Sequence, residues 1–341
     1  MIQPTDKARI AVVGAGLSGL ACANALTERG HSVRVFDKGR APGGRTSTRR
    51  ADLRGVELSF DHGAQYFTVR DAELAERVRH WEEKGVVKPW AGRIAVLGTG
   101  GSVESYSHKP RYVGAPGMNA ICQHLASDQD VHCGVTVGRI VPVRAGVQVL
   151  DLNGRTLGEF DFAVATAPPS QTAALLADAA PAIAARAASV VMKPCWAVMA
   201  AFESRLDVPY DGAFINEGPL SWVARTSSKP ARTESPDRWV LHGSAPWSVD
   251  HLEDAAESAT SQLLDAFFEA IGRHPLDPLW ATAHRWRFAL AENPLDEGCL
   301  FDASVGIAAC GDWAHGNRVE GALLSGLAAA RRVDHAASTR R

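Results

Sequence analysis

The sequence predicts an α/β fold in which a Rossmann-like dinucleotide-binding domain is joined to a second domain built on a mainly antiparallel sheet. Three observations carry this prediction. A strand, a glycine turn and a helix open the chain at residues 10–29, an Asn-Gly hairpin interrupts the parallel pattern at 147–160, and β-like, tryptophan-rich runs fill residues 190–283. A chain of 341 residues exceeds the usual size of a single core, so two domains are expected.

The opening unit is the strongest local signal. An apolar strand at residues 10–13 leads into Gly14-Ala15-Gly16-Leu17-Ser18-Gly19, and an alanine-rich helix follows to residue 29. Glycines let the backbone turn tightly, and the helix N-terminus offers N–H groups and a positive dipole end to a pyrophosphate. A second strand, 33–36, ends at Asp37, beside Lys38, where a carboxylate can bind ribose hydroxyls. A dinucleotide site is predicted here; an ordinary glycine-rich βα turn is the alternative.

The next segment departs from a nicotinamide-type Rossmann pattern. A turn-rich loop at 40–45 and the stretch 61–67 stand where a further helix and strand are expected, which indicates a ligand other than NAD. A helix is predicted over 71–85, strands of a second sheet over 86–112, and a helix after 116–119 that ends near 127. Asn153-Gly154 joins strands 147–152 and 155–160 in a type I′ hairpin, and a strand at 160–167 precedes alanine-rich helical sequence to 189.

The last third of the sequence returns to the first domain. Ser248 is expected to cap a helix with an apolar stripe from Leu252 to Ile271. A buried strand at 306–310 then leads to Gly311-Asp312 and a helix from about residue 320. The expected first domain is therefore discontinuous, with residues 1–75, 107–180 and 285–335; the second has 76–106 and 181–284, and 336–341 form a frayed tail.

Composition limits the function classes. A net charge of −2 gives no broad attraction to nucleic acid or anionic membranes, so neither is expected as a partner. The six cysteines lack metal-ligand spacing and are expected to be reduced, buried thiols, with no metal site. No signal peptide and no run of 18 apolar residues occurs, so a cytoplasmic protein is expected. The oligomeric state stays open.

Three separated segments resemble the FAD-binding signature of the flavoproteins with the p-hydroxybenzoate hydroxylase type of fold, which include the amine oxidases. They are the Gly14 turn with Asp37, the Gly43-Gly44-Arg45 loop, and the Gly311-Asp312 strand and helix. Within that superfamily the chain resembles the bacterial-type renalase family over nearly its whole length. The matching stretches are 61–67, 193–197, 284–287, 311–313 and 318–322. His62 stands where leucine is common.

The resemblance implies FAD and a set of residues around it. Noncovalent binding is expected, because no cysteine or histidine sits in a recognisable linkage motif near the expected flavin edge. The residues expected at the pyrophosphate and ribose are those of the Gly14–Gly19 turn, including Ser18, with Asp37, Lys38, Gly44 and Arg45. Gly63, Ala64, Gln65 and Tyr66 are expected beside the isoalloxazine ring, and the main chain at Val137 beside adenine. Asp312 is expected at the ribityl or phosphate region, and the helix beginning near Arg318, Val319, Glu320 and Ala322 directs its dipole at the flavin C2 carbonyl. Asp61 is expected to be a turn residue.

The basic run after the loop has two interpretations. Arg45, Arg49, Arg50 and Arg54 can form a solvated basic loop, or reach phosphates through their guanidinium groups. Arg45 is expected to be functional and Arg54 solvated.

On the substrate side, His242 and Trp286 are the candidates, together with Gln65. A core histidine and a packing tryptophan are the competing interpretations. Arg225, Arg232, Arg285 and Arg287 are candidates for substrate phosphates.

The resemblance implies an oxidase of 2- or 6-dihydro-NAD(P), in which hydride passes to flavin N5 and O₂ becomes hydrogen peroxide. Small-molecule substrate and O₂ are the implied partners. A flavin amine oxidase is the main alternative; many such enzymes use a lysine from the later sequence, and none follows Lys229 here. A carotenoid-type desaturase and a non-enzymatic dinucleotide sensor are the weaker alternatives.

Overall fold

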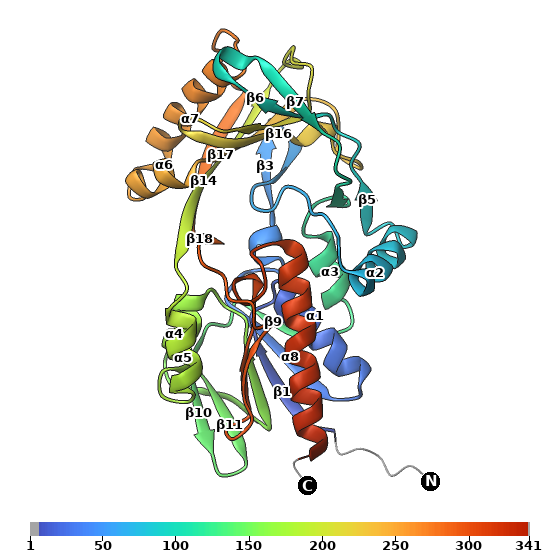
Figure 1. The fold of residues 1–341 in the computed structure, drawn as a ribbon, viewed down its shortest axis with the longest axis vertical. Helices are drawn as coiled ribbons and strands as arrows, with labels where there is room; N and C mark the ends of the chain where they lie inside the picture. Colours follow the sequence, from blue (N-terminus) through green and yellow to red (C-terminus); the bar gives the residue numbers. More distant parts are fainter. Residues whose placement is uncertain (1–6, 340–341) are drawn as a thin grey trace. The chain divides into compact units, whose positions relative to one another are not determined.

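The computed structural model describes residues 7–339, which form two compact units (Figure 1). The first unit contains residues up to 44, 121–192 and from 291 onwards; the second contains 45–120 and 193–290. The chain therefore enters the second unit at Arg45, well before the expected residue 76. The segment 45–75, with the loop at 61–67, belongs to the second unit, and so do residues 107–120 and 285–290, whereas residues 181–192 belong to the first; the expected bounds are wrong at these places.

The first unit is built on a six-stranded sheet with the order β19-β20-β13-β1-β2-β9. Its pairs are parallel except for β19–β20. The strands are β1 (Arg9–Val13), β2 (Ser32–Asp37), β9 (Asp130–Cys133), β13 (Phe162–Ala165), β19 (Leu300–Asp302) and β20 (Ile307–Ala309). The cores of β1, β13 and β20 are apolar and fully buried, as expected for parallel strands covered on both faces.

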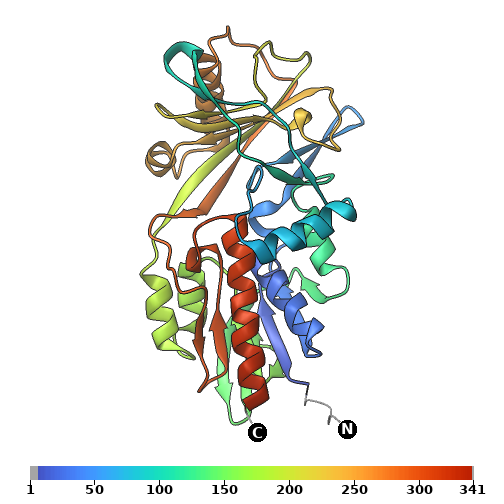
Figure 2. The ribbon, with the colours of Figure 1, turned by 45° about the vertical axis from the view of Figure 1, so that its right-hand side comes forward.

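Helices and a small sheet cover this parallel sheet. The helices are α1 (Leu17–Glu28), α3 (Ala120–Ala126), α4 (Pro169–Leu176), α5 (Pro181–Ala188) and α8 (Val319–Thr339), and the small sheet consists of β10 (Val137–Val143), β11 (Gly146–Asp151) and β12 (Thr156–Phe160). Figure 2 shows α8 lying along the sheet close to α1. A Cβ at Gly326 of α8 would overlap the carbonyl oxygen of Ser18, so only glycine allows this close helix packing.

The second unit is built on a seven-stranded sheet with the order β18-β14-β17-β16-β15-β6-β7. The strands are β6 (Ile94–Leu97), β7 (Val103–Ser107), β14 (Met192–Phe202), β15 (Gly212–Ile215), β16 (Leu220–Arg225), β17 (Asp237–Gly243) and β18 (Trp280–Ala291). The pairs β14–β17, β17–β16, β16–β15 and β6–β7 are antiparallel, and β15–β6 is parallel. The expected fold class, a Rossmann-like α/β domain with a mainly antiparallel second sheet, is confirmed.

Two apolar clusters of the second unit pack on its seven-stranded sheet. Helix α7 (Ala256–Ala270) packs its apolar stripe, including Leu263 and Phe267, on the sheet. A hairpin of β3 (Thr48–Leu53) and β4 (Val56–Asp61) packs Leu58 and Phe60 against Met199, Ala201 and Val240 of the sheet. The remaining elements are α2 (Ala72–Glu83), β5 (Val87–Pro89), β8 (Tyr112–Gly114) and α6 (Ala245–Asp250).

Two local expectations are wrong. Ser248 does not cap the long helix: it lies inside α6, where its buried hydroxyl accepts a hydrogen bond from the Trp196 amide at 3.2 Å. Pro246 near the start of α6 favours this separate short helix, because proline is preorganised for the first helical turn. The tail expected to fray from residue 336 is helical as far as Thr339, since Val333 and Ala336 bury their side chains.

Candidate functional site

The glycine turn of the first unit joins β1 to α1 and is held by Asp37. The Gly14 amide donates to the Phe36 carbonyl at 2.8 Å. The two carboxylate oxygens of Asp37 accept from the amides of Ala15 and Gly39, each at 2.6 Å. Because each carboxylate oxygen has two lone pairs, Asp37 keeps acceptor capacity for ribose hydroxyls after fixing the turn.

The space at this turn fits a pyrophosphate. Gly14 has φ +119°, and a side chain there would overlap the Thr166 hydroxyl, so the tight turn requires glycine. Gly16 is the N-cap of α1 and has no side-chain cap; a Cβ at Gly16 would meet nothing within 4 Å. An open helix N-terminus with uncapped amides is what an anionic group needs.

Other predicted FAD ligands lie in the same unit. The hydroxyl of Ser18 donates to Cys310 Sγ at 3.2 Å inside the unit, so the hydroxyl is engaged away from any ligand and Ser18 offers its backbone amide. Lys38 is exposed and reaches Gln171 at 3.3 Å. Val137 begins β10, half-buried, as the first residue of the small sheet.

The C-terminal FAD segment is compact. Asp312 is buried directly after β20, and its carbonyl accepts from the amides of His315 and Asn317 at 3.0 and 2.9 Å. Helix α8 begins at Val319, with Glu320 in its first turn and Arg318 just before it. A Cβ at Gly321 would overlap the His315 carbonyl oxygen, so the turn lies directly against the first turn of the helix. This unit therefore gathers the glycine turn, Asp37, Asp312 and the α8 N-terminus.

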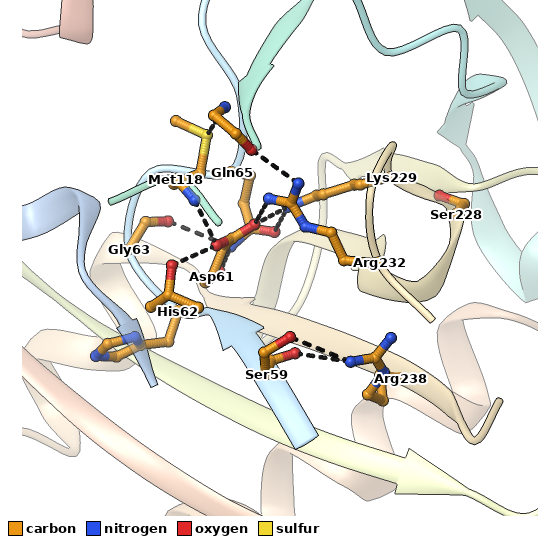
Figure 3. A network of polar contacts seen from close by, with 12 residues as sticks. Ser59, Asp61, His62, Gly63, Gln65, Met118, Ser228, Lys229, Arg232 and Arg238 are labelled. Carbon is orange, nitrogen blue, oxygen red and sulfur yellow. Dashed lines mark hydrogen bonds and ion pairs between the residues drawn. The ribbon is translucent and has the colours of Figure 1, made fainter. Parts of the chain in front are cut away.

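In the second unit, Asp61 is the centre of a buried polar network (Figure 3). Its carboxylate accepts from Thr48 Oγ1 and the Met118 amide, both at 2.8 Å, from Arg232 Nη2 at 2.6 Å and from Lys229 Nζ at 3.3 Å. Burial alone would raise the pKa of Asp61, but the combined effect of Lys229, Arg232 and the Met118 amide is larger and lowers this pKa from 3.8 to about 2. The expectation that Asp61 is a turn residue is wrong: it ends β4 and is ionised inside the unit.

Lys229 connects this carboxylate to Gln65. Its ammonium, with no exposed side-chain surface, donates to Gln65 Oε1 at 3.1 Å and lies 5.6 Å from the Trp90 ring centroid. The Gln65 amide nitrogen donates to the carbonyls of Asp61 and Gly63, so both ends of the carboxamide are fixed. Burial lowers the pKa of Lys229 to about 8 despite the neighbouring Asp61. Sequence reasoning missed this residue because its polar loop resembles surface sequence.

The two substrate-side candidates meet at one backbone carbonyl. Trp286 Nε1 donates to the His62 carbonyl at 2.9 Å, and His242 Nε2 lies 3.3 Å from the same oxygen. The His62 ring stacks on Trp286, with centroids 5.0 Å apart, and meets His284 edge-on at 4.8 Å. Burial lowers the pKa of His62 to about 3 and that of His242 to about 4, so both imidazoles are neutral at neutral pH.

The loop between Arg45 and Gln65 is tightly packed. The Arg45 carbonyl accepts from the Ala64 amide at 2.9 Å, and a Cβ at Gly63 would overlap that same carbonyl oxygen. Arg45 Nη1 donates to the Ala289 carbonyl at 2.9 Å. The Tyr66 ring lies against Trp222, at 5.4 Å, under the Arg111 guanidinium.

The arginines considered for substrate phosphates have other roles. Arg225 is fully buried and pairs with Asp237 at 3.0 Å, and Arg232 is buried on Asp61. Arg285 and Arg287 both pair with Glu253 at the surface. The expectation that Arg225 or Arg232 is a phosphate ligand is therefore wrong, because a buried guanidinium already satisfied by carboxylates is inaccessible.

Neither a metal cluster nor a membrane helix is present between residues 7 and 339. No three His, Cys, Asp or Glu side chains of this part gather as metal ligands would. None of its helices has the length and apolar character needed to cross a bilayer. All six cysteines are free thiols, and Cys22, Cys122 and Cys310 are buried.

The fold and the glycine-turn site define a nucleotide-binding flavoprotein class of oxidoreductases, and comparisons with known families agree. Residues 12–80 match the NAD(P)-binding Rossmann-like domain, and residues 90–334 match the flavin-containing amine oxidoreductases. The second match covers more than half of the chain. The chain therefore belongs to the flavin-containing amine oxidoreductase family, and its cofactor is FAD.

Curated relatives match over short stretches. A 4,4′-diapophytoene desaturase of Staphylococcus haemolyticus is 39% identical over 83 residues, which cover 24% of this chain and 16% of the desaturase. A zeta-carotene-forming phytoene desaturase of Myxococcus xanthus is 46% identical over 52 residues, covering 15% of this chain and 10% of that protein. The chain thus matches only a small part of each relative's length.

Solved structures match over nearly the whole chain. A putrescine oxidase bound to putrescine superposes with a TM-score of 0.72 at 16% identity, covering 97% of this chain and 99% of that one. A cyclohexylamine oxidase from Brevibacterium oxydans gives 0.72 at 14% identity, covering 96% and 99%. At these identities the likeness establishes the fold.

Proposed function

We propose that this family member is an FAD-dependent oxidase of the renalase type, acting on 2- or 6-dihydro-NAD(P). The substrate loses hydride from its sp³ ring carbon and becomes the aromatic pyridinium of β-NAD(P)⁺. When bound, FAD supplies the hydride acceptor at N5 and returns the electrons to O₂, which leaves as hydrogen peroxide. The substrate and O₂ are the only partners that the reaction requires.

The observation that carries the proposal is the convergence at the His62 carbonyl. Segments 61–67, 239–242 and 284–287, far apart in the sequence, meet there through Trp286 and His242. The first stretch is expected beside the FAD ring, and His242 and Trp286 of the other two are expected on the substrate side. Their meeting inside one unit supports a single face of planar side chains on which a pyridine ring can stack.

The protonation states of these rings support hydride loss as the reaction. His62 and His242 are uncharged at neutral pH because burial disfavours the imidazolium. Uncharged imidazole and indole faces tolerate the positive charge that develops on the pyridine ring, whereas imidazolium would repel it. A dihydropyridine needs no base, since aromatisation drives hydride departure, so orientation by these rings is the main contribution required of the chain.

The first unit offers the residues that would hold FAD. The Gly14–Gly19 turn would bind the pyrophosphate, Asp37 the adenosine ribose and Asp312 the ribityl or phosphate region. The α8 N-terminus supplies a positive dipole end suited to the negative charge of reduced flavin. The open space at Gly16 is the feature that fits this assignment best.

Lys229 favours a second candidate, a flavin amine oxidase. No lysine follows residue 229, yet Lys229 itself is buried and donates a hydrogen bond to Gln65. A pKa of about 8 gives it a neutral fraction that can exchange protons with an amine. The Asp61 carboxylate nevertheless binds this ammonium, which favours a fixed cation and ranks the amine oxidase second.

Anaerobic mixing separates the two candidates. The purified yellow protein is mixed with 2- and 6-dihydro-NAD(P), with 4-dihydro-NADH and with a panel of amines, while the visible band of oxidised flavin is followed. The proposal predicts fast bleaching by a 2- or 6-dihydro isomer and peroxide when air is admitted. Bleaching by amines alone would establish the second candidate, and a colourless protein would overturn both.

A further inference from the structure

Arg49 lies on the face of the β3–β4 hairpin that carries the ring cluster. In the antiparallel register Arg49 is paired with Phe60, so both side chains project from the same face. His62, two residues beyond Phe60, follows directly after the end of β4. Phe60 stacks on Trp280, with centroids 5.1 Å apart, and so aligns this face with β18.

The guanidinium of Arg49 acts on both imidazoles of the cluster. His62 follows directly after β4 and meets His284 edge-on, so both imidazoles lie close to the end of the hairpin that carries Arg49. Burial is the largest cause that lowers the pKa of both imidazoles, and the Arg49 charge lowers them further, for His62 together with His284. His284 and Trp286 are half-buried and Arg49 is exposed, so a ligand can reach the group from solvent. The Nδ1 atom of His62 is buried without a hydrogen-bond partner.

The positive charge of Arg49 is uncompensated within the described part of the chain. Its neighbour Arg50 pairs with Glu57 at 3.7 Å, whereas Arg49 forms no ion pair with any residue between 7 and 339. An exposed guanidinium can bind an oxyanion through two parallel, charge-assisted N–H···O hydrogen bonds. The imidazole of His284, which contacts His62 at this end of the hairpin, adds a further nitrogen for an oxygen ligand.

We propose that Arg49, with His284 beside it, forms an anion subsite that binds a phosphate group of the dihydropyridine nucleotide while its ring stacks on the His62–Trp286 face. The subsite deepens the proposed function and rests on it. A phosphate needs a planar bidentate donor and a neighbouring nitrogen donor, and this face supplies both.

The test compares two substrates that differ only in the phosphate. Rates of flavin bleaching are measured anaerobically with a 2- or 6-dihydronicotinamide mononucleotide and with its unphosphorylated riboside. In the unmodified protein the phosphate should raise kcat/KM by roughly 10- to 100-fold, as expected for a charge-assisted bidentate contact. In Arg49→Gln the ratio should fall to about 1–3, with riboside rates unchanged, and Arg49→Lys should retain part of it.

Arg50→Gln is the matched control, because Arg50 is the adjacent exposed arginine and already has a carboxylate partner. Its phosphate preference should equal that of the unmodified protein. Calorimetric titration of the FAD-loaded protein with oxidised nicotinamide mononucleotide gives a second readout: Arg49→Gln should bind at least roughly tenfold more weakly.

The outcomes separate the subsite from the proposed function. If both substrates bleach the flavin and Arg49→Gln keeps the full phosphate preference, the subsite is refuted and the function stands. If Arg49→Gln instead loses FAD while the preference is unchanged, Arg49 serves a phosphate of the cofactor and the subsite is also refuted. If neither substrate bleaches the flavin and calorimetry detects no binding, the proposed function is refuted, and the subsite, which rests on it, is refuted with it.

Discussion

Replacing Asp61 with asparagine tests whether the buried network is held by charge. The substitution keeps the size of the side chain but leaves Lys229 and Arg232, both within ion-pair distance of Asp61, without their carboxylate. Removing one partner of a buried ion pair costs about 3–5 kcal/mol. The lowering of the Asp61 pKa from 3.8 to about 2 corresponds to about 2–3 kcal/mol, which is of the same order.

The assay is urea unfolding of the FAD-loaded protein at pH 7, with saturating FAD in every sample. Asp61→Asn should lose about 3–5 kcal/mol of unfolding free energy. Adding Lys229→Met should restore about 1–2 kcal/mol, because one uncompensated buried cation is removed. Asp52→Asn, at an exposed position of the same hairpin, should change stability by less than about 0.5 kcal/mol. A loss below about 1 kcal/mol in Asp61→Asn would refute the account of the network.

Three further predictions concern acid stability, the glycine turn and the ring face. The folded-state pKa values of His62 (about 3) and His242 (about 4) lie below the ordinary 6.5, so the unfolded chain takes up protons first and the unfolding free energy should fall as pH drops from 6.5 towards 4. Asp61, whose pKa is lowered from 3.8 to about 2, adds a further loss of unfolding free energy between these two pH values. Denaturant titrations measure this profile, and an unfolding free energy that stays constant from pH 7 to 4 would contradict it. Gly16→Ala should lower the unfolding free energy of the FAD-free protein by about 1 kcal/mol or less, because its Cβ enters open space at the helix N-terminus. Since FAD is expected to occupy that space, the same variant should weaken FAD binding at least roughly tenfold in a fluorescence titration, whereas Gly218→Ala should leave the FAD affinity unchanged. Trp286→Leu should slow anaerobic flavin reduction at least roughly tenfold, and Trp286→Phe by less than about fivefold, because phenylalanine keeps a stacking ring. Equal effects of the two substitutions would show that Trp286 does not act by stacking.

Local sequence patterns predict the parts of the fold that depend on local chemistry. The Gly14 turn, the β11–β12 hairpin and the strand before Asp312 each need particular residues at particular backbone positions, so they can be read from short stretches. The predicted type I′ turn at Asn153-Gly154 is wrong: only Gly154 has a positive φ, and its amide donates to the Asp151 carbonyl at 3.1 Å, so the turn is centred on Leu152 and Asn153. The cap assigned to Ser248 failed because Pro246 favours a separate helix nearby.

The Asp61 network could not be predicted in the same way. Asp61 and Lys229 are 168 residues apart, and nothing in the local sequence of either indicates burial. The loop around Lys229 and Arg232 is polar and resembles surface sequence; only the fold of the second unit brings these cations onto one carboxylate. The sequence identifies Trp286 and His242 as separate candidates, but it does not predict that both side chains contact the same backbone carbonyl of His62.

A single-turnover product analysis tests the central claim most directly. The FAD-loaded protein is reduced without oxygen by excess 2- or 6-dihydro-NAD(P), and the β-NAD(P)⁺ formed is measured against the flavin bleached. The account predicts one equivalent of β-NAD(P)⁺ for each flavin reduced, followed by one equivalent of hydrogen peroxide on admission of air. Flavin that stays oxidised with both isomers, while an amine reduces it and yields its imine or aldehyde, would contradict the account.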